Sequence, residues 1–163
     1  MARKVFYSFY YDDDAARVQQ VKQMGRIESQ PLLTGNKWEE IKKGGDPAIE
    51  RWIKDQMTGK TCLVVLVGAR TASRPWVQYE IKEAWKNGLG VVGIRIHSLK
   101  DLQEQIAVRG ANPFDQLNLN GKPFAQIVTL YDPAGSNSKE VYADISNNLE
   151  NLVERAIQIR ARY

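Results

Sequence analysis

Glu80 is the residue whose type and spacing best suit chemistry. It follows Trp76 by four residues, in a segment from about 75 to 87 whose apolar side chains recur at helical spacing. The stripe of this helix that would face a core consists of Val77, Ile81, Ala84 and Trp85. Trp76 and Glu80 fall on a stripe at the border of that core, where partial loss of water raises the pKa of a carboxyl group. The alternative is a glutamate that pairs with a surface cation from elsewhere in the fold, and spacing alone favours that alternative.

Aromatic, hydroxyl and imidazole side chains lie at the carboxyl ends of three predicted strands. They are Phe9, Tyr10 and Asp12 at the end of the first strand, Thr71 after the strand that contains Cys62, and His97 after the next. Because ligands of open α/β sheets bind outside the carboxyl ends of the strands, we expect these side chains to converge on one site. For His97 a structural or binding-pocket role is favoured over general acid–base catalysis. Asn112-Pro113-Phe114 first indicates a turn with an apolar anchor.

The elements that must position these residues alternate between strands and helices. Strands are predicted at 5–10, 61–67, 91–96 and about 126–131, with a short one near Leu32-Leu33 in an otherwise irregular stretch of 25–45. Helices are predicted after Asp12-Asp13-Asp14, from Asp46-Pro47 to Gly59, over 75–87, and from about 141 to 156. This alternation predicts an α/β fold, a mostly parallel sheet of about five strands with helices on both faces.

Composition narrows the class of protein. At 163 residues, with 43% hydrophobic and 26% charged residues, the chain suits a single domain over 1–163. It contains one cysteine and one histidine, so an intrachain disulfide is excluded and no metal site is expected. The 23 basic residues are interleaved with 19 acidic ones, which argues against a nucleic-acid partner. The absence of a long apolar stretch or a signal peptide predicts a cytoplasmic protein without a membrane partner.

Two familiar motifs are excluded by the elements that surround them. Residues 88–93 spell G-x-G-x-x-G, but they follow a predicted helix and enter a strand, whereas a dinucleotide fingerprint needs a strand, then glycines, then a helix. The triple aspartate after the first strand is similar to the acidic cluster of phospho-receiver domains. Those domains need an aspartate at the end of the central strand, where this chain has Val67-Gly68.

The ordered set of motifs resembles the TIR domain family. Lys4-Val5-Phe6-Tyr7-Ser8-Phe9, followed by aspartates, resembles the opening strand and loop, and Trp76-Val77-Gln78-Tyr79-Glu80 resembles the Trp-x-x-x-Glu motif that carries the catalytic glutamate. The finer pattern is similar to the bacterial TIR-like family that includes the TIR subunits of Thoeris antiphage systems. Its marks are the segments 46–53, 71–81, 93–97 and 110–114, and the resemblance spans roughly residues 4–131. It makes Glu80 the expected catalytic residue of a TIR-like, flavodoxin-like three-layer domain.

The resemblance implies cleavage of the nicotinamide–ribose bond of NAD. NAD would be the substrate, no cofactor would be needed, and the product would be a cyclic ADP-ribose-type signal that activates a separate effector protein. Glu80 would stabilise the oxocarbenium charge on the ribose. Phe9, Tyr10 and Trp76 would stack on a base, with Asp12 beside them, and Thr71, His97 and Asn112 would bond ribose or phosphate oxygens. A phage-derived trigger and further copies of the chain are the other partners implied.

Two other classes of function remain open. One is a non-catalytic TIR-like module that acts by homotypic assembly, and the other is a protein that binds a nucleotide without consuming it. TIR enzymes often complete their sites between protomers through the loop after the second strand, which would lie here at about 34–45. We therefore expect Trp38 or Lys37 to touch a neighbouring copy or the substrate in an active assembly.

Overall fold

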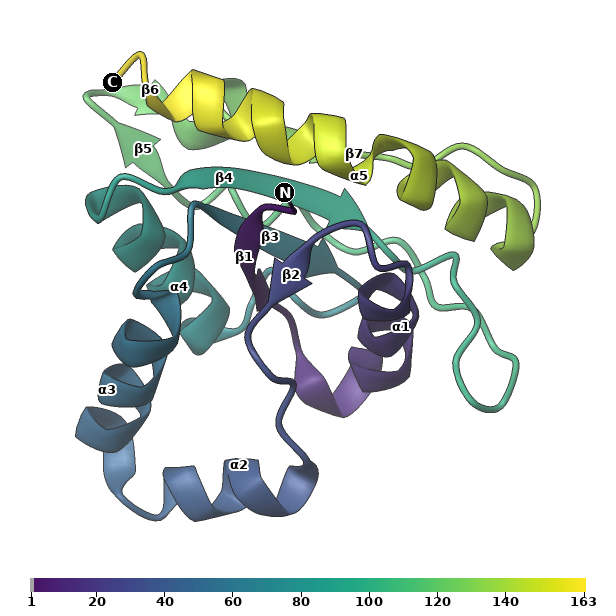
Figure 1. Ribbon diagram of the computed structural model, residues 1–163, viewed down its shortest axis with the longest axis horizontal. Coiled ribbons are helices and arrows are strands. Elements are labelled where there is room, and N and C mark those ends of the chain that lie inside the picture. The colour runs from purple at the N-terminus through teal and green to yellow at the C-terminus, as the bar shows by residue number, and fades with distance from the viewer. Residues whose placement is uncertain (1) are drawn as a thin grey trace.

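The computed structural model describes residues 2–163. Its sheet consists of β1 (Lys4–Ser8), β2 (Glu28–Ser29), β3 (Cys62–Val67), β4 (Gly90–Arg95) and β7 (Thr129–Tyr131). All four neighbouring pairs are parallel, in the order β2-β1-β3-β4-β7. The helices are α1 (Tyr11–Gln23), α2 (Gly35–Lys42), α3 (Gly45–Met57), α4 (Pro75–Lys86) and α5 (Ser138–Arg160). The predicted α/β architecture, with helices on both faces of a parallel sheet, is confirmed (Figure 1).

The central strands are apolar along their whole length because both faces of the sheet are covered. Every residue of β3 and β4 is buried. Successive side chains of a strand point to opposite faces, so Val5 and Tyr7 join the core beneath α1 and α5, while Phe6 joins the core beneath α3 and α4. α5 lies along the length of the sheet in Figure 1. None of the helices in the described part of the chain has the length and apolar character needed to cross a membrane.

The stretch between α1 and α3 differs from the sequence prediction. The second strand lies at Glu28–Ser29 rather than near Leu32-Leu33, and α2 replaces much of the expected loop. Gln30 continues the strand by unusual means: its side-chain amide accepts from the backbone N–H of Tyr7 at 3.0 Å and donates to the Tyr7 carbonyl at 2.9 Å. A two-residue strand extended by a side chain has no periodicity that a sequence pattern can detect.

Other helix and strand boundaries also differ from those predicted from the sequence. The last strand is shorter than expected, because the 3-10 helix η1 (Phe124–Gln126) ends at Gln126 and the N–H groups of Ile127 and Val128 still bond the carbonyl oxygen of Phe124. An unpredicted hairpin, β5 (Asn118–Leu119) with β6 (Lys122–Pro123), precedes it. α3 begins at Gly45, so Asp46 lies in its first turn and is not its N-cap. α2 has no buried residue and lies beyond the sheet, between α1 and α3 in Figure 1.

The glycines of the false dinucleotide motif have packing roles. Gly88 follows the end of α4 with a φ of +82°, a backbone conformation that side chains other than hydrogen disfavour. Gly90 begins β4, and a Cβ added there would lie 2.7 Å from the backbone of Ala156. This glycine therefore lets α5 pack directly on the sheet, which explains the motif without any nucleotide.

A buried ion pair ties α1 to the loop after β4. Arg17, which is 3% exposed, donates to Asp14 at 3.0 Å and to the carbonyl oxygens of Leu99 and Gln105 at 2.7 and 2.9 Å. Asp14 packs against Gly68, and burial raises the pKa of its carboxyl group to about 6 despite the cation beside it. The pair therefore fixes the loops on one side of the sheet's carboxyl edge.

Candidate active site

A cavity of about 310 Å³ opens at the carboxyl end of β1, close to the amino end of α4. Phe6 and Tyr7 come from β1, and the segments that follow β1 and β2 supply further walls. α2, α3 and α4 complete it. The remaining lining residues are Phe9, Tyr10, Tyr11, Asp12, Gln30, Pro31, Leu32, Leu33, Trp38, Lys42, Trp52, Arg74, Pro75, Trp76, Val77 and Glu80. This is the place where ligands of open α/β sheets bind, and the volume suits a small-molecule site.

Glu80 supplies the buried carboxyl group of this largely apolar cavity, whereas Asp12, the other acidic lining residue, is exposed. It comes from α4 with its neighbours Val77 and Ile81 in the core, and it is 8% exposed. The hydroxyl of Ser8, at the end of β1, donates to its Oε1 at 2.6 Å. Burial raises the pKa of Glu80 to about 8, and the Ser8 hydrogen bond opposes this rise only partly. A carboxyl group with such a pKa changes its charge near neutral pH, which suits a role in chemistry.

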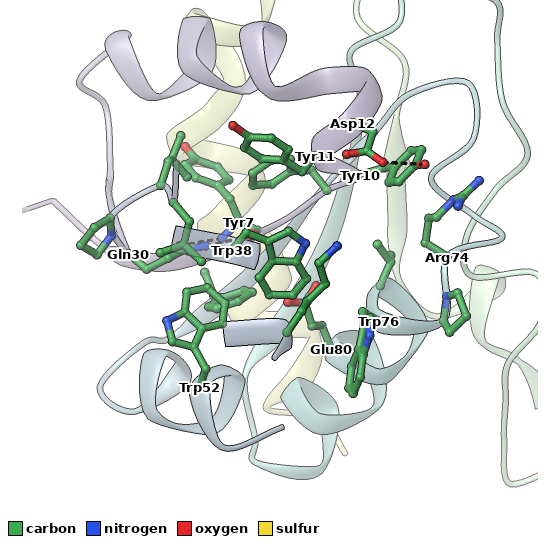
Figure 2. Close-up of a pocket in the computed structure, with 18 residues that line it drawn as sticks. Tyr7, Tyr10, Tyr11, Asp12, Gln30, Trp38, Trp52, Arg74, Trp76 and Glu80 are labelled. Atoms are coloured by element: carbon green, nitrogen blue, oxygen red, sulfur yellow. Dashed lines mark hydrogen bonds between the residues drawn. The ribbon is translucent and has the colours of Figure 1, made fainter. Parts of the chain in front are cut away.

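Aromatic rings form the walls around this carboxyl group. Trp52 and Trp76 lie on either side of Glu80 in the view of Figure 2. Trp38 reaches the cavity from α2 and meets Trp52 edge to face, with ring centroids 6.2 Å apart. Trp76 meets Tyr79 in the same way at 5.4 Å. Such walls offer ring faces and edges to a planar ligand.

Charged groups gather at the rim. The guanidinium of Arg74 stacks on the ring of Tyr10, 3.9 Å from the centroid, and the Tyr10 hydroxyl donates to Asp12 at 3.2 Å (Figure 2). Arg70 pairs with Asp13, but Arg74 forms no ion pair with a carboxylate within residues 2–163. The Tyr10 ring thus positions the guanidinium of Arg74 at the mouth of the cavity, where it is available to an anionic group of a ligand.

The structure brings together five of the residues that the sequence singled out. Phe9, Tyr10, Asp12, Trp76 and Glu80 all line the cavity, although they come from two segments about 65 residues apart in the chain. Trp38 also lines it, as an interior aromatic of α2 rather than a residue of a loop. Lys37 does not; its ammonium group lies 3.6 Å from Glu40.

Three other predicted residues do not line the cavity. Thr71 is fully buried and accepts the N–H of Gly68 at 2.7 Å, which closes the turn after β3. Asn112 accepts the N–H of Phe114 at 2.8 Å, as the turn interpretation of its motif requires. His97 follows β4, and its buried Nδ1 has no hydrogen-bond partner within residues 2–163. Their contact with a substrate stays a prediction.

Sequence reasoning missed Ser8, Gln30 and Arg74 as residues of the site. A hydroxyl at the end of an otherwise apolar strand was the available signal for Ser8. For Gln30 no signal existed, because its role depends on the register of β1 with β2. Arg74 precedes a helix-starting proline, a position that by itself indicates only a helix boundary. No three His, Cys, Asp or Glu side chains of residues 2–163 are grouped so that they could hold a metal ion.

Comparison with known proteins identifies the family. The family model for the TIR-like domain of the Thoeris protein ThsB matches residues 6–101, which include the last three residues of β1, all of α4 and the whole lining of the cavity. The chain belongs to the ThsB TIR-like family. It is also 31% identical over 152 residues to a protein of Bacillus cereus (strain MSX-D12) named "Putative cyclic ADP-D-ribose synthase ThsB1". That similarity covers 90% of this chain and 78% of the relative. The Trp76–Glu80 motif of this ThsB-like chain lies within the matched residues.

Proposed function

We propose that this ThsB-like protein cleaves the nicotinamide–ribose bond of NAD and cyclises the ADP-ribosyl fragment into a cyclic ADP-ribose-type signal. The observation that carries the proposal is the single buried carboxyl group of Glu80 in an aromatic cavity at the sheet's carboxyl edge. The name of the relative from Bacillus cereus supports the same reaction class. NAD is the substrate in this proposal, and the chain needs no separate cofactor.

The chemistry requires a negative charge close to the reacting ribose carbon. When the C–N bond breaks, its electron pair leaves with nicotinamide, and positive oxocarbenium character develops on the ribose. An ionised Glu80 stabilises that charge, and it does so strongly because burial leaves little water around its carboxyl group. The nicotinamide ring of bound NAD is itself cationic. Its proximity favours the ionised form of Glu80, which burial disfavours in the free protein.

The remaining walls suit the other parts of NAD. Trp38, Trp52 and Trp76 offer faces or edges for the planar nicotinamide and adenine rings. Phe9 and Tyr10 extend this aromatic surface towards the mouth. Arg74 at the rim is placed for the diphosphate, whose oxygens a guanidinium binds well.

Cyclisation demands that an internal nucleophile reach the ribose carbon before water does. A hydroxyl of the same ligand then forms the new bond and releases its proton to solvent, or an adenine ring nitrogen forms it with its lone pair and takes up the positive charge that the ribose gives up. The aromatic residues on several sides of the cavity support this outcome, because a ligand folded against them displaces water from the reacting carbon. The product acts on a separate effector protein in antiphage defence. A phage-derived trigger and assembly with further copies of the chain complete the proposal.

Mass spectrometry of the purified protein with NAD tests the reaction and the residue together. We expect release of nicotinamide and a product isobaric with cyclic ADP-ribose, both lost in Glu80→Gln. Glu83→Gln, on the same helix but outside the cavity, is the matched control and retains activity. Linear ADP-ribose as the sole product would refute cyclisation. NAD that binds without turnover, also in lysate from phage-infected cells, would instead indicate a nucleotide-binding module.

A further inference from the structure

We propose that Ser8 is a positioning residue that holds the carboxyl group of Glu80 with one oxygen anchored and the other free for the substrate. The inference rests on the proposed function, because it assigns a role within the same site. Its basis is the contact between the end of β1 and the middle of α4.

The fold aims the Ser8 hydroxyl at α4. Ser8 is the last residue of β1 and pairs in register with Val65 of β3. Since side chains alternate along a strand, Ser8 shares the face of Phe6, which packs in the core beneath α3 and α4. Its side chain is 1% exposed and lies 2.6 Å, Oγ to Oε1, from Glu80. The contact joins residues 72 apart in the chain.

The two oxygens of Glu80 have different surroundings. Oε1 accepts the Ser8 hydroxyl, which is its only hydrogen-bond donor in the described part of the chain. Oε2 accepts no hydrogen bond there, and it is not fully buried. It therefore retains contact with the open space of the cavity that Glu80 lines. The hydrogen bond thus fixes which oxygen faces a ligand.

This arrangement gives Ser8 two effects on the reaction. A glutamate side chain has several rotatable bonds, and a short hydrogen bond to one oxygen limits the positions of the other. The hydroxyl also donates to the charged form of a carboxyl group that is otherwise deprived of hydrogen bonds. Loss of the hydroxyl makes ionisation of Glu80 harder, so its effect on turnover depends on pH.

The first test compares Ser8→Ala with the unaltered protein in NAD turnover across pH. We expect the acidic limb of kcat/KM to move upward by about one pH unit, with a loss of roughly tenfold at pH 7 that narrows as pH rises towards 10. Ser29→Ala is the matched control, because its hydroxyl donates to the adjacent carbonyl oxygen of Gln30 and Ser29 does not line the cavity. An equal loss at every pH would reduce Ser8 to a structural residue and overturn the proposal.

A second measurement does not depend on turnover. Titration of the side-chain ¹³C carboxyl signals by NMR, with Glu80→Gln to assign the signal, reports the ionisation of Glu80 directly. We expect the midpoint of this signal to rise in Ser8→Ala and to stay in place in Ser29→Ala. An unchanged midpoint in Ser8→Ala overturns the role of Ser8. A raised midpoint in a protein that does not consume NAD supports the assigned contact and refutes the proposed reaction instead.

Discussion

The buried carboxyl group of Glu80 makes a prediction about stability that is independent of any substrate. Its pKa is about 8 in the folded protein, whereas an exposed glutamate has a pKa of 4.5. Between these two values the folded state binds more protons than the unfolded state. The free energy of unfolding therefore falls as pH rises through this window, and the cost of the buried charge is complete above about pH 8. Glu80→Gln removes the titrating group, so it relieves this cost at high pH.

The size of the effect follows from the pKa difference. Each pKa unit corresponds to about 1.36 kcal/mol, so the shift of Glu80 is worth about 3 to 5 kcal/mol at pH 9. Burial of the side chain leaves little water to screen the charge. For a protein of this length, such a difference corresponds to a Tm change on the order of 10 °C. Relative to the unaltered protein, Glu80→Gln should gain this stability between pH 5 and pH 9.

Urea denaturation of both proteins at pH 5, 7 and 9 measures the effect. The difference in the free energy of unfolding should grow with pH in favour of Glu80→Gln. The offset at pH 5 reports what the amide costs in place of a protonated carboxyl group, including its fit to the Ser8 hydroxyl. Glu83→Gln controls for the loss of one acidic residue from α4. A difference between Glu80→Gln and the unaltered protein that is constant over this range would refute burial of the charge as the cause.

Two further predictions concern the cavity and the buried ion pair. Trp38→Ala should raise KM for NAD about tenfold, because aromatic contact with a base is typically worth about 1–3 kcal/mol. Initial rates measure turnover, and size-exclusion chromatography measures assembly. If neither changes, Trp38 touches neither the substrate nor a neighbouring copy. Gly68→Ala should lower the free energy of unfolding by about 1–3 kcal/mol, because the added Cβ would lie 2.1 Å from the buried Asp14 carboxylate. Thermal unfolding measures this loss against Gly35→Ala, whose Cβ would meet nothing closer than 3.5 Å, and equal Tm values for the two variants would contradict it.

A stability cost at Glu80 is consistent with a functional site. A glutamine or an apolar residue would satisfy this position of α4 at less cost above neutral pH, yet the chain buries a carboxyl group with one hydrogen-bond donor. Groups that are costly to bury persist where their chemistry is used. The prediction on stability and the proposed reaction therefore concern the same physical feature.

The sequence by itself determined the layered architecture and placed Glu80 at the border of the core. Continuous apolar runs such as Cys62–Val67 predict strands buried on both faces, and the spacing of Val77, Ile81 and Ala84 places Glu80 beside the core. These patterns depend on local periodicity, which is written in the order of residues. The resemblance to TIR domains added the catalytic role of Glu80, which stays a prediction; the family match confirms the family itself.

Only the tertiary structure decided which residues meet. The Ser8–Glu80 contact, the Gln30 side chain that extends β2, and the position of Arg74 over Tyr10 each depend on register or on the packing of distant segments. Thr71 and Asn112 were expected at the site from their positions in the sequence, but each accepts a backbone hydrogen bond that closes a local turn, and neither lines the cavity. Backbone N–H groups in a turn often donate to a nearby side-chain oxygen, and a pattern of residue types does not distinguish such a residue from one that contacts a ligand.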